Sequence, residues 1–135
     1  MDVDHHLQIV VVTSDRYYHC KPMESFFKIP FIYTDKTDWI EIEKNNPSVL
    51  IFLADWTTDH VALIEQARKH FIPTILLMDG LIDWKGFVGS TKWLAGNNIL
   101  PYHPVYCDKV FAPGFRTART LLSWGNSTSK IEVTG

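Results

Sequence analysis

The sequence has no strong excess of charge of either sign. Thirteen lysine and arginine residues stand against fifteen aspartate and glutamate residues, which leaves a formal net charge of −2. A chain this close to neutrality lacks the basic field that nucleic-acid-binding domains usually carry. We therefore expect no nucleic-acid partner. A peripheral contact with a membrane, through a small local patch of basic side chains, stays an open alternative.

Cysteine is scarce, and long hydrophobic runs are missing. The two cysteines, Cys20 and Cys107, are too few for a disulfide scaffold, which predicts reduced thiols in a cytoplasmic protein. Residues 1–8 are acidic and contain histidines, unlike the basic start of a signal peptide. No apolar run approaches the roughly 20 residues that cross a bilayer, so the sequence predicts no transmembrane segment.

Several signatures of nucleotide binding and catalysis are also missing. No GxGxxG follows the first predicted strand, and there is no P-loop, GxSxG elbow or HExxH helix. The pairs His19-Cys20 and His103-x-x-x-Cys107 contain zinc-ligand residue types, but nothing in the sequence brings the two pairs together. We therefore expect no metal and no cofactor.

What the chain does contain is an alternation of apolar strands and amphipathic helices. Strands are predicted over 8–13, 29–34, 49–54, 73–78, 109–112 and 130–134. Helices are predicted over 38–45, 59–71 and 115–124, with a shorter candidate over 23–28, while 79–107 has no clean period. This order predicts one Rossmann-like α/β domain over residues 1–135, with three αβα layers around a mostly parallel sheet.

Polar residues follow three of the predicted strands, at the edge where open α/β sheets bind ligands. They are Ser14 and Asp15, then Asp55, Trp56 and Thr57, then Asp79 and Gly80. Asp55 and Asp79 are the candidate catalytic carboxylates, because a carboxylate at this edge can accept a hydrogen bond from a sugar hydroxyl or act as a general base. In the alternative interpretation, Asp55 caps the following helix and Asp79 stabilises a turn.

Trp84 lies in the long irregular segment together with other large aromatic side chains. An exposed tryptophan beside a cleft can stack on the apolar face of a sugar, which makes Trp84 a candidate substrate-binding residue. The alternative is that these aromatic side chains cover the edge of the sheet as a minor core.

Two segments of the sequence resemble a known family. PSVLIFLADWTTDHVALIEQARKHFIPTILLMDG (47–80) resembles the N-terminal domain of GT-B fold glycosyltransferases, where strand, helix, "IPT" and a second strand end in a turn containing glycine. CDKVFAPGFRTARTLLSWGNSTSKIEVTG (107–135) is similar to the closing unit of that domain, with its "WG", "KI" and final "VTG". Capsule and teichoic-acid polymer transferases and UDP-N-acetylglucosamine 2-epimerases share this ending.

The resemblance implies the acceptor-side N-terminal domain of a glycosyltransferase-like protein in cell-surface carbohydrate biosynthesis. Its partner would be a carbohydrate or lipid-linked acceptor, held by Asp55 and Asp79. In the family the nucleotide-sugar site lies mainly in the C-terminal domain, so we expect donor binding only together with such a domain and little activity without it. Two alternatives stay open: a non-catalytic α/β module that binds a ligand or a protein, and a fragment of a nucleotide-sugar 2-epimerase.

Overall fold

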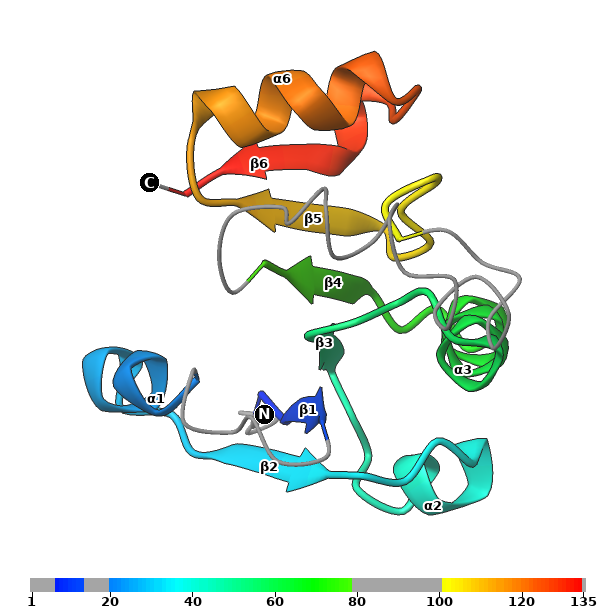
Figure 1. Ribbon diagram of the computed structural model, residues 1–135. Helices are drawn as coiled ribbons and strands as arrows, with labels where there is room; N and C mark the ends of the chain where they lie inside the picture. The colour runs from blue at the N-terminus through cyan, green and yellow to red at the C-terminus, as the bar shows by residue number, and fades with distance from the viewer. Residues whose placement is uncertain (1–6, 14–19, 79–100, 135) are drawn as a thin grey trace.

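A computed structural model of the chain describes residues 7–13, 20–78 and 101–134 (Figure 1). Its centre is a six-stranded sheet in the order β2-β1-β3-β4-β5-β6, and every neighbouring pair is parallel. The strands are β1 (Ile9–Val12), β2 (Phe31–Thr34), β3 (Val49–Phe52), β4 (Thr74–Leu77), β5 (Lys109–Ala112) and β6 (Ile131–Val133). The predicted α/β class and the parallel sheet are confirmed.

Described helices connect β1 to β2, β2 to β3, β3 to β4 and β5 to β6. They are α1 (Lys21–Phe27), α2 (Trp39–Glu43), α3 (Thr58–Lys69) and α6 (Phe115–Ser123), with a 3-10 turn η2 (Thr128–Lys130). Gly125 follows α6 with a φ of 90°, in the left-handed region that its position after a helix predicts. No helix in the described parts of the chain is long and apolar enough to cross a membrane.

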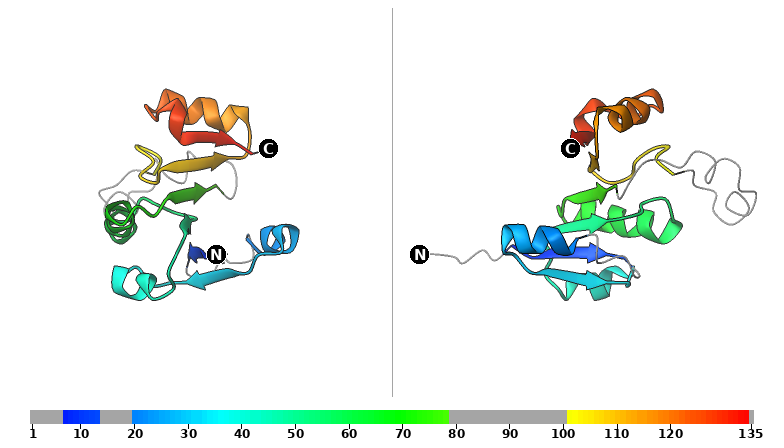
Figure 2. Two further views of the ribbon diagram at one scale, coloured as in Figure 1. Left: turned by 180° about the vertical axis from the view of Figure 1, so that it is seen from behind. Right: turned by 60° about the vertical axis from the view of Figure 1, so that its left-hand side comes forward.

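Side chains on the two faces of the sheet form two separate cores. Along β1, Val10 and Val12 belong to the larger core, whereas Val11 faces the smaller one, as the two-residue period of a strand requires. The larger core includes Ile42 of α2, Leu63 of α3 and Leu121 of α6. Figures 1 and 2 show α1 on the opposite side of the sheet from α2 and α3, which gives the predicted three layers.

The strand order places a topological switch point between β1 and β3. From β1 the chain first moves to β2 at one edge, and then returns past β1 to β3 on its other side. Val12, the last residue of β1, pairs with Phe52, the last residue of β3. The two segments that leave these strands therefore begin side by side, and such a crevice is where open α/β sheets bind ligands.

Candidate functional site

The switch point lies at the ends of β1 and β3, the strands that two of the three predicted polar segments follow in the sequence. After β1, the Thr13 amide donates a hydrogen bond of 2.8 Å to the carbonyl of Thr34, which ties the end of β1 to the end of β2. Ser14 and Asp15 follow Thr13 directly and lie outside the described residues. The predicted site residues Asp79, Gly80 and Trp84 lie outside them as well.

After β3, the chain turns into α3, and Thr57 caps that helix. The Thr57 hydroxyl accepts a hydrogen bond of 3.2 Å from the backbone N–H of His60, which satisfies one of the free amides of the first turn. The interpretation that Asp55 is the cap is therefore wrong. A capping side chain must lie next to the first turn of the helix, and the Asp55 carboxylate instead binds a distant part of the chain.

Asp55 is fully buried and fixes the segment that precedes β5. Its Oδ2 accepts hydrogen bonds from the backbone N–H groups of Tyr106, at 2.7 Å, and Cys107, at 3.1 Å. The other oxygen, Oδ1, is buried and has no hydrogen-bond partner within the described part of the chain. In this arrangement Asp55 holds the backbone in place and is not open to solvent.

The environment of Asp55 also changes its acidity. Burial raises the pKa of this carboxyl above its usual value. The two backbone amides, the Cys107 thiol and the Lys130 ammonium act in the opposite direction, because each favours the ionised form. Burial likewise raises the pKa of the Cys107 thiol, and the nearby Asp55 carboxylate adds to this effect. The cluster therefore keeps the thiol protonated.

Further side chains fix the same segment. The buried side chain of Asn126 accepts a hydrogen bond from Val105 N at 2.8 Å and donates one to the Tyr102 carbonyl at 2.9 Å. Lys130 Nζ donates to the Val105 carbonyl at 2.7 Å, and Arg68 Nη2 donates to the Tyr106 carbonyl at 3.1 Å. Residues 102–107, which form no helix or strand, are thus held by side chains from several parts of the fold.

An aromatic row links the turn after β3 to this segment. The ring centroids of Trp56 and Tyr102 lie 5.1 Å apart. The Tyr102 centroid in turn lies 6.5 Å from that of Trp124, at the end of α6. His103 stacks on Trp124, with ring centroids 4.2 Å apart. Trp56 is only 9% exposed, so its main contact surface is the protein interior.

His60 was not singled out by the sequence patterns, yet it lies in the first turn of α3 at the switch point. Its ring meets that of Phe52, the last residue of β3, edge to face at 5.6 Å. Burial lowers the pKa of His60, which favours the neutral imidazole. Its Nδ1 is buried without a hydrogen-bond partner within the described part of the chain. The available signal was its position three residues after a helix cap that follows a buried strand.

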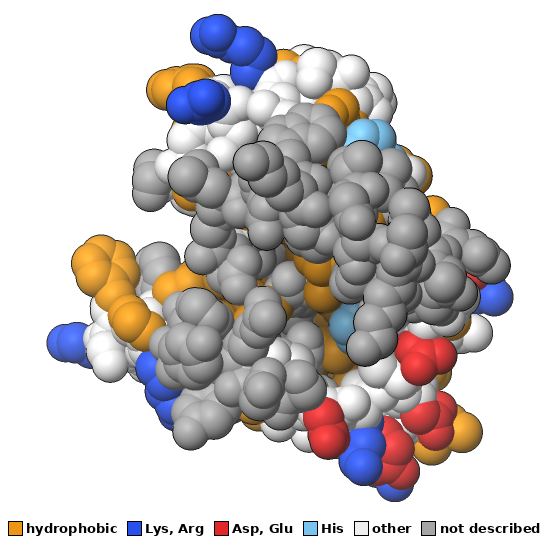
Figure 3. All heavy atoms as spheres, viewed as in Figure 1, with side chains coloured by type: hydrophobic (Ala, Val, Ile, Leu, Met, Phe, Trp, Pro, Cys, Tyr) orange, Lys and Arg blue, Asp and Glu red, His pale blue; other side chains and the backbone are white. Residues whose placement is uncertain are grey.

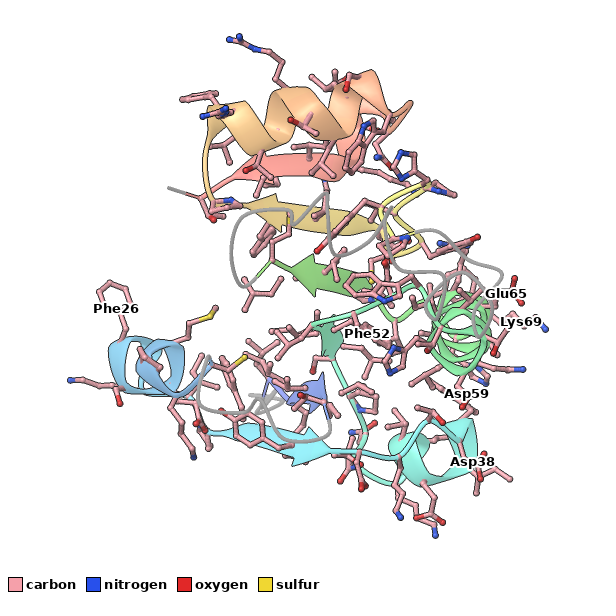
Figure 4. The ribbon with its side chains drawn as sticks, viewed as in Figure 1. Phe26, Asp38, Phe52, Asp59, Glu65 and Lys69 are labelled. Carbon is pink, nitrogen blue, oxygen red and sulfur yellow. The ribbon has the colours of Figure 1, made fainter. Side chains whose placement is uncertain are left out.

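On this face of the molecule, charged side chains lie on the outer surfaces of the helices. Figure 4 shows Phe52 between β3 and α3, while Glu65 and Lys69 project from α3 away from the sheet. In Figure 3, acidic side chains gather over α2 and α3 at the lower right. A neutral imidazole has one nitrogen that donates a hydrogen bond and one that accepts. The His60 ring is therefore of a type that binds a hydroxyl group without adding charge to this part of the molecule.

The two cysteines, whose residue type suits zinc, lie in different cores. Cys20 belongs to the smaller core and Cys107 to the larger one, on opposite faces of the sheet, and both are free thiols. Within residues 7–13, 20–78 and 101–134, no group of three histidine, cysteine, aspartate or glutamate side chains is arranged to hold a metal ion.

Comparison with known proteins adds no family assignment. A scan against models of protein families finds no match, and a search of curated proteins finds no relative.

Proposed function

We propose that the chain is the acceptor-side N-terminal domain of a glycosyltransferase-like protein that acts in cell-surface carbohydrate biosynthesis. The observation that supports this most is the pairing of Val12 with Phe52 at the switch point, which starts two polar segments at neighbouring positions. The sequence likeness over 107–135 adds support, because β5, α6 and β6 fall on the successive parts of that closing unit.

In this proposal the acceptor lies over the carboxyl ends of β1 and β3. His60 offers a neutral hydrogen-bonding group there, and Ser14, Asp15 and Thr57 belong to the segments that leave the two strands. Asp79 is the proposed carboxylate for the acceptor hydroxyl. Asp55 acts as a positioning residue, since both of its hydrogen bonds hold the backbone before β5.

The proposal is tested by NMR titration of the isotope-labelled chain with saccharide acceptors and, separately, with UDP-, CDP- and GDP-linked sugars. We expect acceptors to shift the amide signals of Thr13, Ala54, Thr57 and His60. Nucleotide sugars should bind at about millimolar affinity or more weakly, near −4 kcal/mol. Micromolar binding of a nucleotide sugar would contradict the assignment of this chain to the acceptor side.

Two histidines at opposite ends of α3 provide a matched pair of variants: His60 in its first turn and His70 at its C-cap. His60→Gln should weaken acceptor binding by up to about tenfold, the value of one hydrogen bond. His70→Gln, at the other end of α3, should leave it unchanged because His70 bonds to the Gln66 carbonyl of its own helix. If no saccharide binds, or if both variants behave alike, the acceptor site is not at the switch point, and a non-catalytic binding module becomes the better interpretation.

A further inference from the structure

The outer face of α6 carries an unusual combination of exposed side chains. Phe115 is 78% exposed and Leu122 is 41% exposed, although both are large and apolar. Arg116 and Arg119 are exposed on the same helix, and neither forms an ion pair with a residue that the structure describes. Phe115, Arg119 and Leu122 are spaced by four and three positions, which places them along one stripe of the helix.

This helix also differs from the other described helices in its charge. α1, α2 and α3 each contain at least one acidic residue, whereas FRTARTLLS, the sequence of α6, contains none. In Figure 3, Lys and Arg side chains lie over α6 at the top without acidic side chains beside them, and the acidic ones gather over α2 and α3. Among the described α-helices, α6 is therefore the one that carries cationic side chains without an acidic residue.

We propose that the outer face of α6, formed by Phe115, Arg116, Arg119 and Leu122, binds an anionic membrane surface. Apolar side chains flanked by arginines are the combination that an interfacial helix needs, because the apolar groups enter the acyl boundary while the cations meet anionic headgroups. The positive charge of this face complements an anionic lipid surface. The inference does not depend on the proposed glycosyltransferase function.

The face is small, so its binding is weak by itself. A nine-residue helix is about 14 Å long and inserts few side chains. Each arginine near an anionic surface contributes about a factor of five in binding, and the contribution falls as salt screens the charges. The expected behaviour is a reversible contact that places the carboxyl edge of β5 near the membrane, since Phe115 follows that strand closely.

The test is co-sedimentation of the full 135-residue chain with vesicles of two compositions: phosphatidylcholine alone, and phosphatidylcholine mixed with phosphatidylglycerol. We expect binding to the mixed vesicles, which weakens as salt is added, and little binding to phosphatidylcholine. The double variant Arg116→Gln/Arg119→Gln should weaken binding to the mixed vesicles about 30-fold. The charge-matched control Lys36→Gln/Lys69→Gln changes exposed lysines elsewhere and should have little effect.

A second pair of variants separates insertion from charge. Phe115→Ser should weaken binding about tenfold, whereas Phe71→Ser, at a residue that is 93% exposed beyond the end of α3, should not. Circular dichroism in urea verifies that each variant is folded. Substitutions at exposed positions such as these usually change the free energy of unfolding little. Absence of vesicle binding, or equal losses in the test and control variants, overturns the proposal. Binding of polyglutamate through α6 in place of vesicles also overturns it, and assigns the face to an acidic protein.

Discussion

The Asp55 carboxylate and the Cys107 backbone amide, 52 residues apart in the chain, form a buried hydrogen bond of 3.1 Å. This bond joins the turn between β3 and α3 to the segment that leads into β5. It explains how residues without regular secondary structure have a defined place beside the sheet. The same carboxylate also holds the Tyr106 amide, so loss of one side chain leaves two amides without an acceptor.

Replacement of Asp55 should therefore destabilise the fold. We expect Asp55→Ala to lower the free energy of unfolding by about 3 kcal/mol, because two backbone amides lose their partner. Asp55→Asn should cost about 1 kcal/mol, since its carbonyl oxygen can still accept both bonds. Urea denaturation measures both losses, with Asp59→Asn, at an exposed position in the first turn of α3, as the control. Equal stability of Asp55→Ala and the wild type would contradict the anchoring role.

Asn126 provides a second anchor, and its loss should open the same segment. Its side chain makes hydrogen bonds to Val105 N, the Tyr102 carbonyl and the Leu121 carbonyl, at 2.8, 2.9 and 3.0 Å. We expect Asn126→Ala to cost about 3 kcal/mol and to speed hydrogen exchange at the Val105 amide. Asn45→Ala, which removes one contact of 3.5 Å to the Glu41 carbonyl, is the control and should change little.

Acid should destabilise the contact between α1 and β2 through Glu24. The Phe31 amide and the Tyr33 hydroxyl donate to its two oxygens at 2.6 and 2.7 Å. These bonds lower the pKa of Glu24 from 4.5 to about 2, so the folded state binds its proton more weakly than the unfolded state does. The contribution of Glu24 to the free energy of unfolding is therefore full above pH 4.5, and it is lost as the pH falls toward about 2.

The measurement for Glu24 is urea denaturation at a series of pH values. Glu24→Gln should be less stable than the wild type at neutral pH, and the difference should shrink with acid. Glu43→Gln removes an equal charge from an exposed position on α2 and should leave the acid dependence intact. A difference between wild type and Glu24→Gln that stays constant across this pH range would contradict the argument.

The half-buried imidazole of His60 predicts a second loss of stability with acid, which begins at a higher pH than the one at Glu24. Its pKa is lowered below the usual 6.5, because burial disfavours the charged form. The stabilisation is therefore full above pH 6.5 and decreases as the pH falls through the pKa of the folded state. NMR titration of the ring protons checks the pKa, and His60→Gln should remove this part of the stability profile. A titration midpoint at or above 6.5 would show that the ring is solvated.

The secondary structure of this protein was largely determined by local sequence. The run of β-branched residues in β1 and the apolar run in β3 predict strands covered on both faces, and both strands form there. Gly125 marks the end of α6, because a residue without Cβ suits that position. At the start of α3 the sequence places a cap in the Asp55–Thr57 turn, and the structure assigns it to Thr57. Such signals act over a few residues, so the sequence alone carries them.

The roles of the polar residues were decided by the tertiary structure. Asp55 follows a strand as an acceptor-binding carboxylate would, but its hydrogen-bond partners are 51 and 52 residues away, and no local pattern contains them. His60 gains its lowered pKa from burial beside Phe52, which depends on how α3 packs against β3. Strand order likewise fixes the switch point, because pairing between distant strands is a long-range choice. Local propensity therefore determined where the strands and helices form, and packing between distant segments determined what their polar side chains can do.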